Sequence, residues 1–292
     1  MQFSVRPVIA AAAAQDEIVL AALRKAADLG LCRALLIGEA EEIRAIAARE
    51  NISLEGMEIV PCADKMACCT LAVQLVRENK AHAVMKGNVA TATILRAVLN
   101  AEYGLRESEL LSFVSVFELP GFDRLIYLTD PALNMYPDLA AKKHILENSL
   151  QVAKALGNDN PVVACLCAIE TVNPKMPCTV DAAELVRMNR AGEITNCIVT
   201  GPLALDNCLY REAALHKGIE DPHAGMADIL LAPQIETGNA LYKSFAFVAK
   251  ATLGGVLVGA SAPVILTSRV DSESTKVNSI ALAMRIANER MG

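Results

Sequence analysis

The chain has 292 residues, of which 53% are hydrophobic and 21% are charged, and it carries a formal net charge of -6 with a pI of about 5.4. This composition is typical of globular proteins and excludes an intrinsically disordered chain. The acidic balance argues against nucleic acid or an anionic membrane surface as the main partner.

No segment of the sequence predicts a membrane span or a metal site. The longest apolar stretch, residues 254–266, is too short to cross a bilayer, and the first ten residues lack the pattern of a signal peptide. The nine cysteines include no Cys-x-x-Cys pair, and the four histidines show no ligand spacing. We therefore expect a cytoplasmic protein with reduced thiols, no bound metal and no membrane partner.

Apolar runs alternate with amphipathic segments through the first hundred residues. The predicted strands are residues 6–13, 33–38, 57–61 and 83–85, and the predicted helices are 16–29, 41–50, 68–79 and 91–100. Strands that alternate with helices across short connections are typical of right-handed βαβ units and a parallel sheet. The pattern therefore predicts an α/β fold.

The middle of the chain begins differently and then resumes this alternation. Residues 111–117 and 124–129 predict two antiparallel strands joined by a Pro120-Gly121 turn. Further strands are predicted at 161–167, 194–200 and 229–232, and helices at 139–156, 181–192 and 237–253. We expect two α/β domains, a discontinuous first one of residues 1–135 plus 260–292 and a second of 136–259.

Residues 263–276, PVILTSRVDSESTK, lead from a short buried strand into a helix that Asp271, Ser272 or Ser274 would cap. Ser268 and Arg269 then lie between the carboxyl end of a strand and a helix N-terminus, where ligands and anions bind in α/β proteins. A hydroxyl beside a guanidinium suits a phosphate or a developing oxyanion. The alternative is a simple turn with a solvated arginine.

Other strand-end loops also carry polar groups. Lys86, Gly87 and Asn88 follow a predicted strand, and Thr91 and Arg96 follow on the next helix. The lysine, hydroxyl and guanidinium would donate to an anion, and the glycine would allow a ligand close approach; a plain helix cap is the alternative.

Three more loops, at residues 170–177, 201–207 and 233–239, are less diagnostic. In the last, Gly238 costs about 1 kcal/mol against alanine inside a helix, which indicates close approach by another group. The sequence has no Gly-x-Gly-x-x-Gly, phosphate-loop lysine or Gly-x-Ser-x-Gly motif, which argues against dinucleotide enzymes, nucleotide hydrolases and serine hydrolases.

Taken together, these segments resemble the phosphate acetyl/butyryltransferase family. The resemblance rests on MKGNVATATILRAVL, LTDPALNMYPDL, ETVNPKMP, TGPLALDN, APQIETGNALYKS and PVILTSRVDS, which occur in family order over nearly the whole chain. The compact length, without an added regulatory domain, resembles the butyryl branch of the family.

The resemblance implies two α/β domains around a cleft, an isocitrate/isopropylmalate dehydrogenase-like topology and a homodimer. It also implies a reversible acyl transfer between coenzyme A and inorganic phosphate by direct attack in a ternary complex. Acyl-CoA, phosphate and acyl phosphate are then the small-molecule partners. Coenzyme A is a substrate, and neither a metal nor another cofactor is implied.

The resemblance also implies roles for particular residues. Ser268 and Arg269 match the Ser-Arg pair that acts on the acyl phosphate, and Arg96 matches an arginine that binds phosphate. Asn239 and Lys243 match a Gly-Asn-x-x-x-Lys motif with a role in substrate binding.

The sequence departs from the acetyltransferases in two ways. Their proposed base is an aspartate seven residues after the serine, a position held here by Thr275, so Asp271 is the preferred base, with Glu273 or solvent as alternatives. Their second phosphate-binding arginine has no counterpart that the sequence identifies.

Three other functions compete with butyryl transfer. A phosphate acetyltransferase or another short- or branched-chain acyltransferase differs only in pocket size, and one methylene is worth only about 1–3 kcal/mol. A metal-dependent decarboxylating dehydrogenase would need clustered aspartates and a nucleotide site, and the sequence indicates neither. The third alternative is a non-catalytic binding protein that kept the fold.

Overall fold

The computed structural model of the chain describes residues 6–267 and 271–291. The chain forms two compact units, one of residues 1–109 with 254–292 and the other of residues 110–253. We refer to them as unit 1 and unit 2. Each contains strands and helices in alternation, so the predicted α/β class is confirmed.

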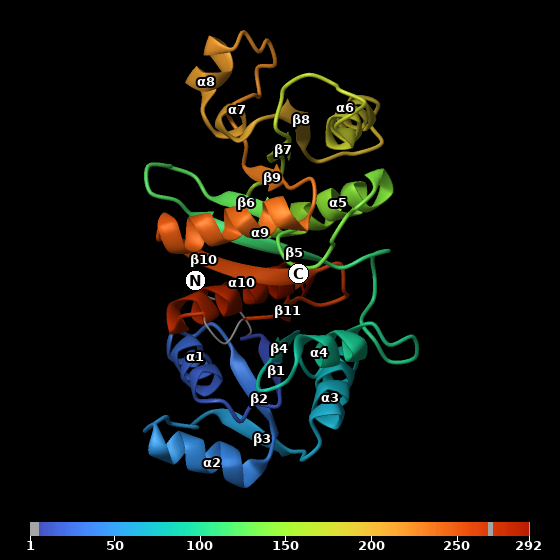
Figure 1. The fold of residues 1–292 in the computed structure, drawn as a ribbon. Helices are drawn as coiled ribbons and strands as arrows, with labels where there is room; N and C mark the ends of the chain where they lie inside the picture. Colours follow the sequence, from blue (N-terminus) through green and yellow to red (C-terminus); the bar gives the residue numbers. More distant parts are fainter. Residues whose placement is uncertain (1–5, 268–270, 292) are drawn as a thin grey trace. The chain divides into compact units, whose positions relative to one another are not determined.

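Unit 1 is built on a mainly parallel sheet (Figure 1). Its strands lie in the order β3-β2-β1-β4-β11-β10, and only β10, which pairs with β11, is antiparallel to its neighbour. The strands are β1 (Val8–Ala12), β2 (Arg33–Gly38), β3 (Met57–Pro61), β4 (Ala83–Lys86), β10 (Thr252–Val258) and β11 (Val264–Ile265). The helices are α1 (Glu17–Asp28), α2 (Ala40–Arg49), α3 (Lys65–Arg77), α4 (Thr91–Val98) and α10 (Glu273–Met291).

Side-chain hydrogen bonds begin two of these helices. Asp16 accepts from the backbone N–H of Val19 at 3.0 Å at the start of α1, and Asp64 accepts from Ala67 at 2.7 Å at the start of α3. Helix α1 packs against α10, and α3 packs against α4. Figure 1 shows α1 on one side of the sheet and α3 and α4 on the other, which explains why central strand β1 is apolar on both faces.

The chain reverses its direction of travel across the sheet at β1. It runs from β1 outward to β2 and β3, then crosses to place β4 on the opposite side of β1. The carboxyl ends of β1 and β4 are joined there by backbone hydrogen bonds from Gly87 to Ala12 (2.9 Å) and from Asn88 to Ala13 (2.7 Å). A topological switch point of this kind is where open α/β sheets bind ligands.

Unit 2 has strand order β5-β6-β9-β7-β8. The predicted hairpin is confirmed, because β5 and β6 pair antiparallel with Phe117 opposite Ile126, whereas β6, β9, β7 and β8 are parallel. The strands are β5 (Ser112–Glu118), β6 (Ile126–Thr129), β7 (Val162–Leu166), β8 (Ile198–Leu203) and β9 (Ile229–Leu231). The helical segments are α5 (Leu139–Ala155), α6 (Pro177–Arg190), α7 (Leu205–Leu209), α8 (Arg211–His216), α9 (Ile235–Lys243) and the π-helix η1 (Ser244–Val248).

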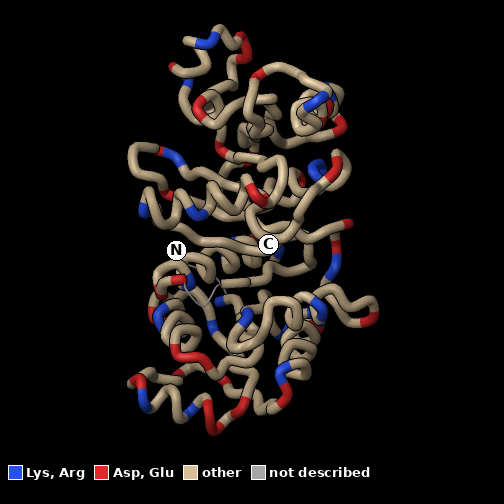
Figure 2. Tube along the Cα trace, in the orientation of Figure 1, with Lys and Arg blue, Asp and Glu red and all other residues tan. Residues whose placement is uncertain are grey.

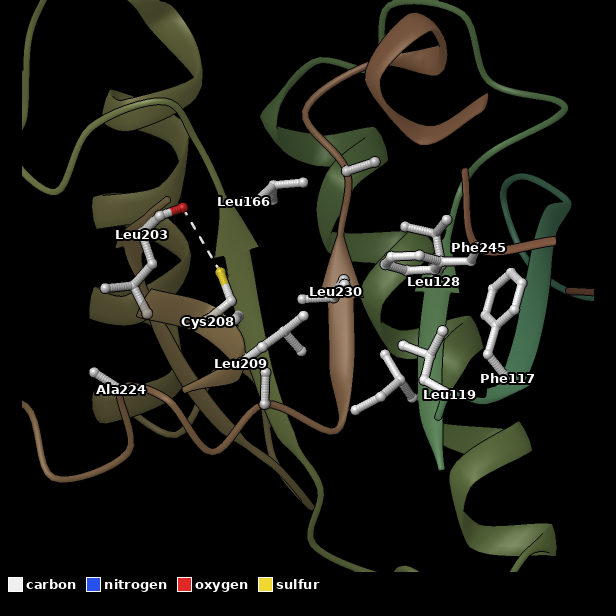
Figure 3. Packing of buried hydrophobic residues seen from close by; sticks show 14 of the residues in the cluster. Phe117, Leu119, Leu128, Leu166, Leu203, Cys208, Leu209, Ala224, Leu230 and Phe245 are labelled. Carbon is white, nitrogen blue, oxygen red and sulfur yellow. Dashed lines mark hydrogen bonds between the residues drawn. The ribbon is translucent and has the colours of Figure 1, made fainter. Parts of the chain in front are cut away.

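The core of unit 2 gathers side chains from β5, β6, β7, β9 and the segment after α9 (Figure 3). The ring of Phe117 meets Phe245 edge-on at 5.3 Å and Tyr242 at 5.8 Å. Leu128 and Leu230 of the central strands are fully buried beside them. This packing fixes where the parallel strands end, and therefore where the loops beyond them lie.

The predicted helix 237–253 is wrong over its second half. Helix α9 ends at Lys243, the π-helix η1 follows, and strand β10 begins at Thr252. Lys250 has a positive φ of 51°, a conformation that no right-handed α-helix contains, and the β-branched residues Thr252, Val256 and Val258 after it favour a strand. The short helices α7 and α8 were not predicted, and α6 begins at Pro177, earlier than expected, with proline in its first turn.

In the structure, the boundaries between the two compact units lie at residues 109/110 and 253/254. The domain boundaries predicted from the sequence lie at 135/136 and 259/260. The difference comes mainly from residues 111–129, which precede the predicted limit in the chain. Strand β6 in this segment pairs with β9, so the hairpin belongs with unit 2. The pairing of β6 with β9 joins segments that are far apart in the sequence, so the order of segments along the chain does not predict it.

Helices with the length and apolar character needed to cross a membrane are absent from the residues that the structure describes. Lys, Arg, Asp and Glu are interspersed along the helices and loops of both units (Figure 2).

A substitution at Gly87 tests whether the close approach of β4 to the end of β1 stabilises the switch point. A Cβ at this residue would overlap the carbonyl oxygen of Ala13 and lie 2.7 Å from that of Ala12. We expect Gly87→Ala to cost about 3 kcal/mol of unfolding free energy, as overpacking against backbone does. Denaturant unfolding of the purified variant measures this loss.

Gly56→Ala is the matched control, because Gly56 has φ +75° but no atom within 4 Å of the added Cβ. That variant should lose only about 1–2 kcal/mol from backbone strain. Equal losses in the two variants would show that close approach at Gly87 is unimportant.

Candidate functional site

A cavity of about 510 Å³ lies at the carboxyl edge of the unit 1 sheet. It is bordered by the loop after β1 with the start of α1, by α2, the end of β4, the segment just after β11 and the first turn of α10. Three carboxylates and three cations line it, together with the polar or small residues of these loops: Asp16, Glu17 and Glu42; Arg49, Lys86 and Lys276; and Gln15, Gly87 and Thr267. The sequence analysis places the Lys86 and Thr267 loops at strand ends, and the structure brings them to one cavity.

Lys86 is a buried cation on the wall of this cavity, with 8% of its surface exposed. Its Nζ donates to the carbonyl oxygens of Gly87 at 3.3 Å and Val89 at 3.2 Å. These two carbonyl oxygens orient the ammonium group. A buried ammonium at a strand end is well suited to hold an anion.

Lys276 is the second buried cation, with only 3% of its surface exposed. Its Nζ donates to the carbonyl oxygen of Asp271 at 3.1 Å. Burial lowers the pKa of Lys276, and the nearby negative charges of Asp271 and Asp16 oppose that shift. Lys276 was not predicted from the sequence to be part of the site. The available signal was its spacing, because Lys276 shares a helix face with Ile280 and Ala283, which are fully buried.

The loop before α10 carries the predicted catalytic pair. Ser268 and Arg269 lie outside the described residues, so their predicted roles stay predictions. Thr267, immediately before them, is buried in the cavity wall.

The cap of α10 is Ser272 rather than Asp271. The Ser272 hydroxyl accepts from the backbone N–H of Thr275 at 3.1 Å, as an N-cap does. Of the alternative bases, Glu273 forms an exposed ion pair with Lys25 at 3.1 Å. Asp271, which is half-buried, stays the preferred base on the resemblance alone.

The remaining predicted residues of unit 1 lie around α4. Asn88 is half-buried, and its backbone N–H is bonded to the end of β1, so this group positions the loop. Thr91 begins α4 and is exposed, as is Arg96 in the last turn of the helix. Neither Thr91 nor Arg96 is part of the cavity wall that the described residues form. Gly87, predicted to admit a ligand, borders the cavity and also packs against the end of β1.

In unit 2 the Gly-Asn-x-x-x-Lys motif packs against the loop after β6. A Cβ on Gly238 would lie 2.6 Å from the carbonyl oxygen of Asp130, so the predicted close neighbour is backbone. Asn239 Nδ2 donates to the carbonyl oxygen of Pro131 at 3.2 Å. Lys243 Nζ lies 5.3 Å from the Tyr242 ring centre. The described contacts of this motif are therefore structural.

Asp130 organises that same loop from a nearly buried position, with 3% of its surface exposed. Its carboxylate accepts from the backbone N–H groups of Ala132 (2.9 Å) and Leu133 (3.0 Å) and from Asn134 Nδ2 (2.6 Å). Burial raises the pKa of Asp130, and these hydrogen bonds oppose the rise. The carboxylate thus holds the LTDPALN segment in place.

A second cavity, of about 720 Å³, lies at the carboxyl edge of the unit 2 sheet. The segments after β6, β7 and β9 and the start of α6 contribute to its wall. Three of the family-like motifs, LTDPALNMYPDL, ETVNPKMP and APQIETGNALYKS, therefore meet at one place. The sequence did not indicate that these loops converge.

The cysteines behave as small apolar side chains. Most are buried, and burial raises the pKa of Cys165 and Cys32 to about 12 each. Among the residues described, no group of three or more His, Cys, Asp or Glu side chains is placed to hold a metal ion.

The chain was compared with protein families, curated proteins and solved structures. The family described as "Phosphate acetyl/butaryl transferase" matches residues 64–284. Phosphate butyryltransferase of Clostridium acetobutylicum is 51% identical over 282 residues, covering 97% of this chain and 94% of that protein. Phosphate acetyltransferase of Thermotoga maritima is 42% identical over 275 residues, covering 94% of this chain and 93% of that protein.

A solved structure agrees with these relatives. The branched-chain phosphotransacylase from Enterococcus faecalis V583 matches with a TM-score of 0.85 and 34% identity, covering 96% of this chain and 99% of that one. The match of the family to more than half of the chain, together with the near full-length relatives, confirms the resemblance seen in the motifs. The chain belongs to the phosphate acetyl/butyryltransferase family.

Proposed function

We propose that this protein transfers a short-chain acyl group reversibly between coenzyme A and inorganic phosphate, with butyryl as the preferred group. The observation that carries the proposal is the 51% identity, over 97% of the chain, to a protein named phosphate butyryltransferase. The Thermotoga maritima relative, named phosphate acetyltransferase, supports acetyl as the alternative acyl group.

The unit 1 cavity supports a phosphate-binding role for two lysines. Lys86 and Lys276 place buried ammonium groups on one cavity wall, and lysine is a common phosphate ligand. Charge–charge attraction is stronger in such a partly desolvated site than at an exposed side chain. We assign phosphate to Lys86 and Lys276 rather than to the exposed Arg96. In this proposal the two lysines take the place of the second phosphate-binding arginine, for which the sequence identifies no counterpart.

The proposed reaction is a direct displacement at the acyl carbon. The thiolate sulfur of coenzyme A attacks the carbonyl carbon of the acyl phosphate, the C–S bond forms, and the C–O bond to phosphate breaks. The thiol proton passes to the base, for which Asp271 is preferred, and phosphate leaves. The reverse reaction begins with attack of a phosphate oxygen on the thioester. Ser268 and Arg269 would stabilise the oxyanion and the phosphoryl group.

Holding two substrates in register provides most of the expected acceleration. Orientation of bound reactants is worth about 7–11 kcal/mol of the barrier, and a hydrogen bond to the developing oxyanion about 3–4 kcal/mol. Asn239 is proposed to act by fixing the loop after β6, through its hydrogen bond to Pro131. For Lys243, whose described contacts are the rings of Tyr242 and Phe247, the proposed role in substrate binding rests on the resemblance. Coenzyme A is a substrate in this scheme, and the proposal needs neither a metal nor another cofactor.

Assembly, location and finer topology are parts of the same proposal. A homodimer is supported by the family resemblance, and light scattering should give about twice the 31.1 kDa chain mass; a monomer at micromolar concentration would contradict it.

A cytoplasmic location, supported by the nine free cysteines, is checked by cell fractionation. The isocitrate/isopropylmalate dehydrogenase-like topology is checked by an experimental structure.

The first prediction concerns activity and acyl preference. Purified protein should convert butyryl-CoA and phosphate to butyryl phosphate and free thiol, with a higher kcat/KM than for acetyl-CoA. A thiol-release assay over acetyl-, propionyl-, butyryl- and isobutyryl-CoA measures both quantities. EDTA in the assay should leave the rate unchanged. No turnover on any thioester would favour the non-catalytic binding protein, and loss of turnover with EDTA would favour a metal-dependent enzyme.

The second prediction separates the two candidate phosphate sites. Lys276→Met and Lys86→Met should each raise the KM for phosphate roughly 10- to 100-fold, because a hydrogen bond to a charged group is worth about 1.5–3 kcal/mol. Initial rates over a phosphate series measure this. Since the pKa of Lys276 is lowered, its charge is lost as pH rises through that pKa, so the wild-type KM should rise in alkaline solution.

Two further variants complete this test. Lys80→Met removes an exposed lysine paired with Glu78 and should leave the KM for phosphate unchanged. Arg96→Met should have little effect if phosphate binds at the two lysines. A large rise in the KM for phosphate with Arg96→Met, together with a normal value for Lys276→Met, would move the phosphate site to α4.

The third prediction separates the base from the helix cap. Ser272→Ala should cost about 1 kcal/mol of stability with near-normal turnover, because Ser272 caps α10. Asp271→Asn should instead lower kcat and alter the acid limb of the pH–rate profile. A loss close to that of Ser268→Ala, expected at roughly 10²–10³ in kcat, would support Asp271 as the base. Normal turnover in Asp271→Asn would leave the role to Glu273 or solvent.

A further inference from the structure

Two of the nine cysteines are partly exposed, Cys62 and Cys178, and the other seven are buried. Cys62 lies in the loop after β3, at the carboxyl edge of the unit 1 sheet, and the proposed reaction does not use it. A partly exposed thiol reacts with oxidants more readily than a thiol in the core. Cys62 is therefore the thiol of unit 1 that an oxidant in solution meets first.

A second thiol lies against Cys62. Cys68 of α3 is fully buried, and its Sγ donates to the carbonyl oxygen of Cys62 at 3.3 Å. The two thiols are also hydrogen-bonded to each other. Cys62 Sγ donates to the carbonyl oxygen of Asp64, the cap of α3, at 3.6 Å, so its side chain is held at the start of the helix. The two sulfur atoms are therefore neighbours in the reduced protein.

Cys69 is next to Cys68 in the chain, but it is not placed to be the partner. Neighbouring residues on an α-helix project about 100° apart, so Cys68 and Cys69 do not both face Cys62. Burial raises the pKa of Cys69 to about 11, and the charge of Lys86 opposes the rise. The thiol of Cys69 thus lies on the side of α3 that is nearer to Lys86.

Burial gives the two neighbouring thiols different roles. It raises the pKa of Cys68 to about 12, and the hydrogen bond with Cys62 adds to the rise, so Cys68 stays a neutral thiol. A buried neutral thiol is inert toward a peroxide, because the thiolate is the nucleophile. It can still react with an oxidised sulfur beside it. Redox-sensing cysteines are accessible and often lie next to a resolving cysteine of this kind.

We propose that hydrogen peroxide converts Cys62 and Cys68 to a reversible disulfide, and that this bond weakens phosphate binding at the unit 1 cavity. The thiolate sulfur of Cys62, its proton lost to solvent, attacks a peroxide oxygen. The S–O bond forms, the O–O bond breaks, and the released hydroxide takes a proton to give water. The Cys68 sulfur then attacks the Cys62 sulfenic acid, the S–S bond forms, and the S–O bond breaks. The second water leaves with the Cys68 proton, so two thiols and one peroxide give one disulfide and two waters.

The effect on phosphate follows from what Cys68 contacts. Its sulfur also accepts a hydrogen bond from the backbone of Ala13, and the carbonyl oxygen of Ala13 accepts from Asn88 at 2.7 Å. A disulfide draws the Cys68 sulfur toward Cys62 and away from this backbone. The strand end that carries Lys86 then loses part of its support. This consequence, unlike the disulfide itself, rests on the proposed function, because it takes phosphate as a substrate.

Mass spectrometry of tryptic peptides tests the disulfide. Cleavage after Lys65 separates Cys62, in peptide 50–65, from Cys68, in peptide 66–77. After the whole protein is treated with hydrogen peroxide, the two peptides should be linked, and dithiothreitol should release them. Peptides that stay unlinked, with Cys62 oxidised to a sulfinic acid, would overturn the proposal.

Cys68→Ser and Cys69→Ser are matched variants, because both positions are fully buried and both lose the same sulfur atom. Cys68→Ser should abolish the link between the peptides, whereas Cys69→Ser should keep it. A link that survives in Cys68→Ser would overturn the assignment. Cys62→Ser changes a partly exposed position and should also abolish the link, so it preserves the test if Cys68→Ser does not fold. Cys178→Ser, at the other partly exposed cysteine, should leave the link unchanged.

Phosphate kinetics test the consequence, once the peroxide has been removed by desalting. Oxidised wild-type protein should have a KM for phosphate at least 3-fold above that of the reduced protein, and dithiothreitol should restore it. Cys62→Ser should keep its untreated KM after the same treatment. Linked peptides with an unchanged KM would overturn the effect on phosphate and leave the proposed function standing. Linked peptides in a protein without transferase activity would support the disulfide while contradicting the proposed function.

Discussion

The close contact between Gly87 and the end of β1 is the constraint on which the unit 1 site depends. Backbone hydrogen bonds from Gly87 and Asn88 to Ala12 and Ala13 join the two strand ends where the sheet reverses direction. Because a side chain at position 87 would overlap backbone, only glycine allows this approach. The contact fixes the direction of Lys86, so a residue without a side chain determines where the buried ammonium lies.

Unit 2 uses the same device at Gly238, which packs against the Asp130–Pro131 backbone. The Asp130 carboxylate accepts hydrogen bonds within the loop after β6, and Asn239 of α9 donates a further one to the carbonyl oxygen of Pro131 in that loop. Residues of the APQIETGNALYKS motif therefore have different structural roles. Some, like Gly238 and Asn239, shape the loop, whereas Gln234, four residues before Gly238, lines the cavity. A motif identifies a family readily, but it does not separate these two kinds of residue.

Most of the fold could be predicted from sequence, because apolar runs of strand length and helical spacing are local signals. The hairpin turn at Pro120-Gly121 and the helix start at Asp16 are local too, whereas the helix predicted from residue 68 begins earlier, at Lys65, behind the Asp64 cap. The site was less predictable, since burial of Lys276 and exposure of Arg96 depend on which helix faces pack against the sheet. The role of Arg96 as a phosphate ligand, expected from a family-like motif, stays a prediction. The end of α9 was missed because it depends on the backbone of Lys250.

The two cavities show how the partner of a buried lysine determines what the lysine can bind. Lys142 meets the carboxylate of Asp181 at 2.6 Å, so the pair is close to neutral and its wall suits an uncharged ligand. Lys276 instead meets the carbonyl oxygen of Asp271 at 3.1 Å, and a carbonyl accepts a hydrogen bond without carrying a net charge. Burial lowers the pKa of Lys276, and the nearby negative charges of Asp271 and Asp16 oppose that shift. The two buried lysines therefore lie in different electrostatic surroundings, one in a direct ion pair with a carboxylate and the other hydrogen-bonded to a backbone carbonyl oxygen.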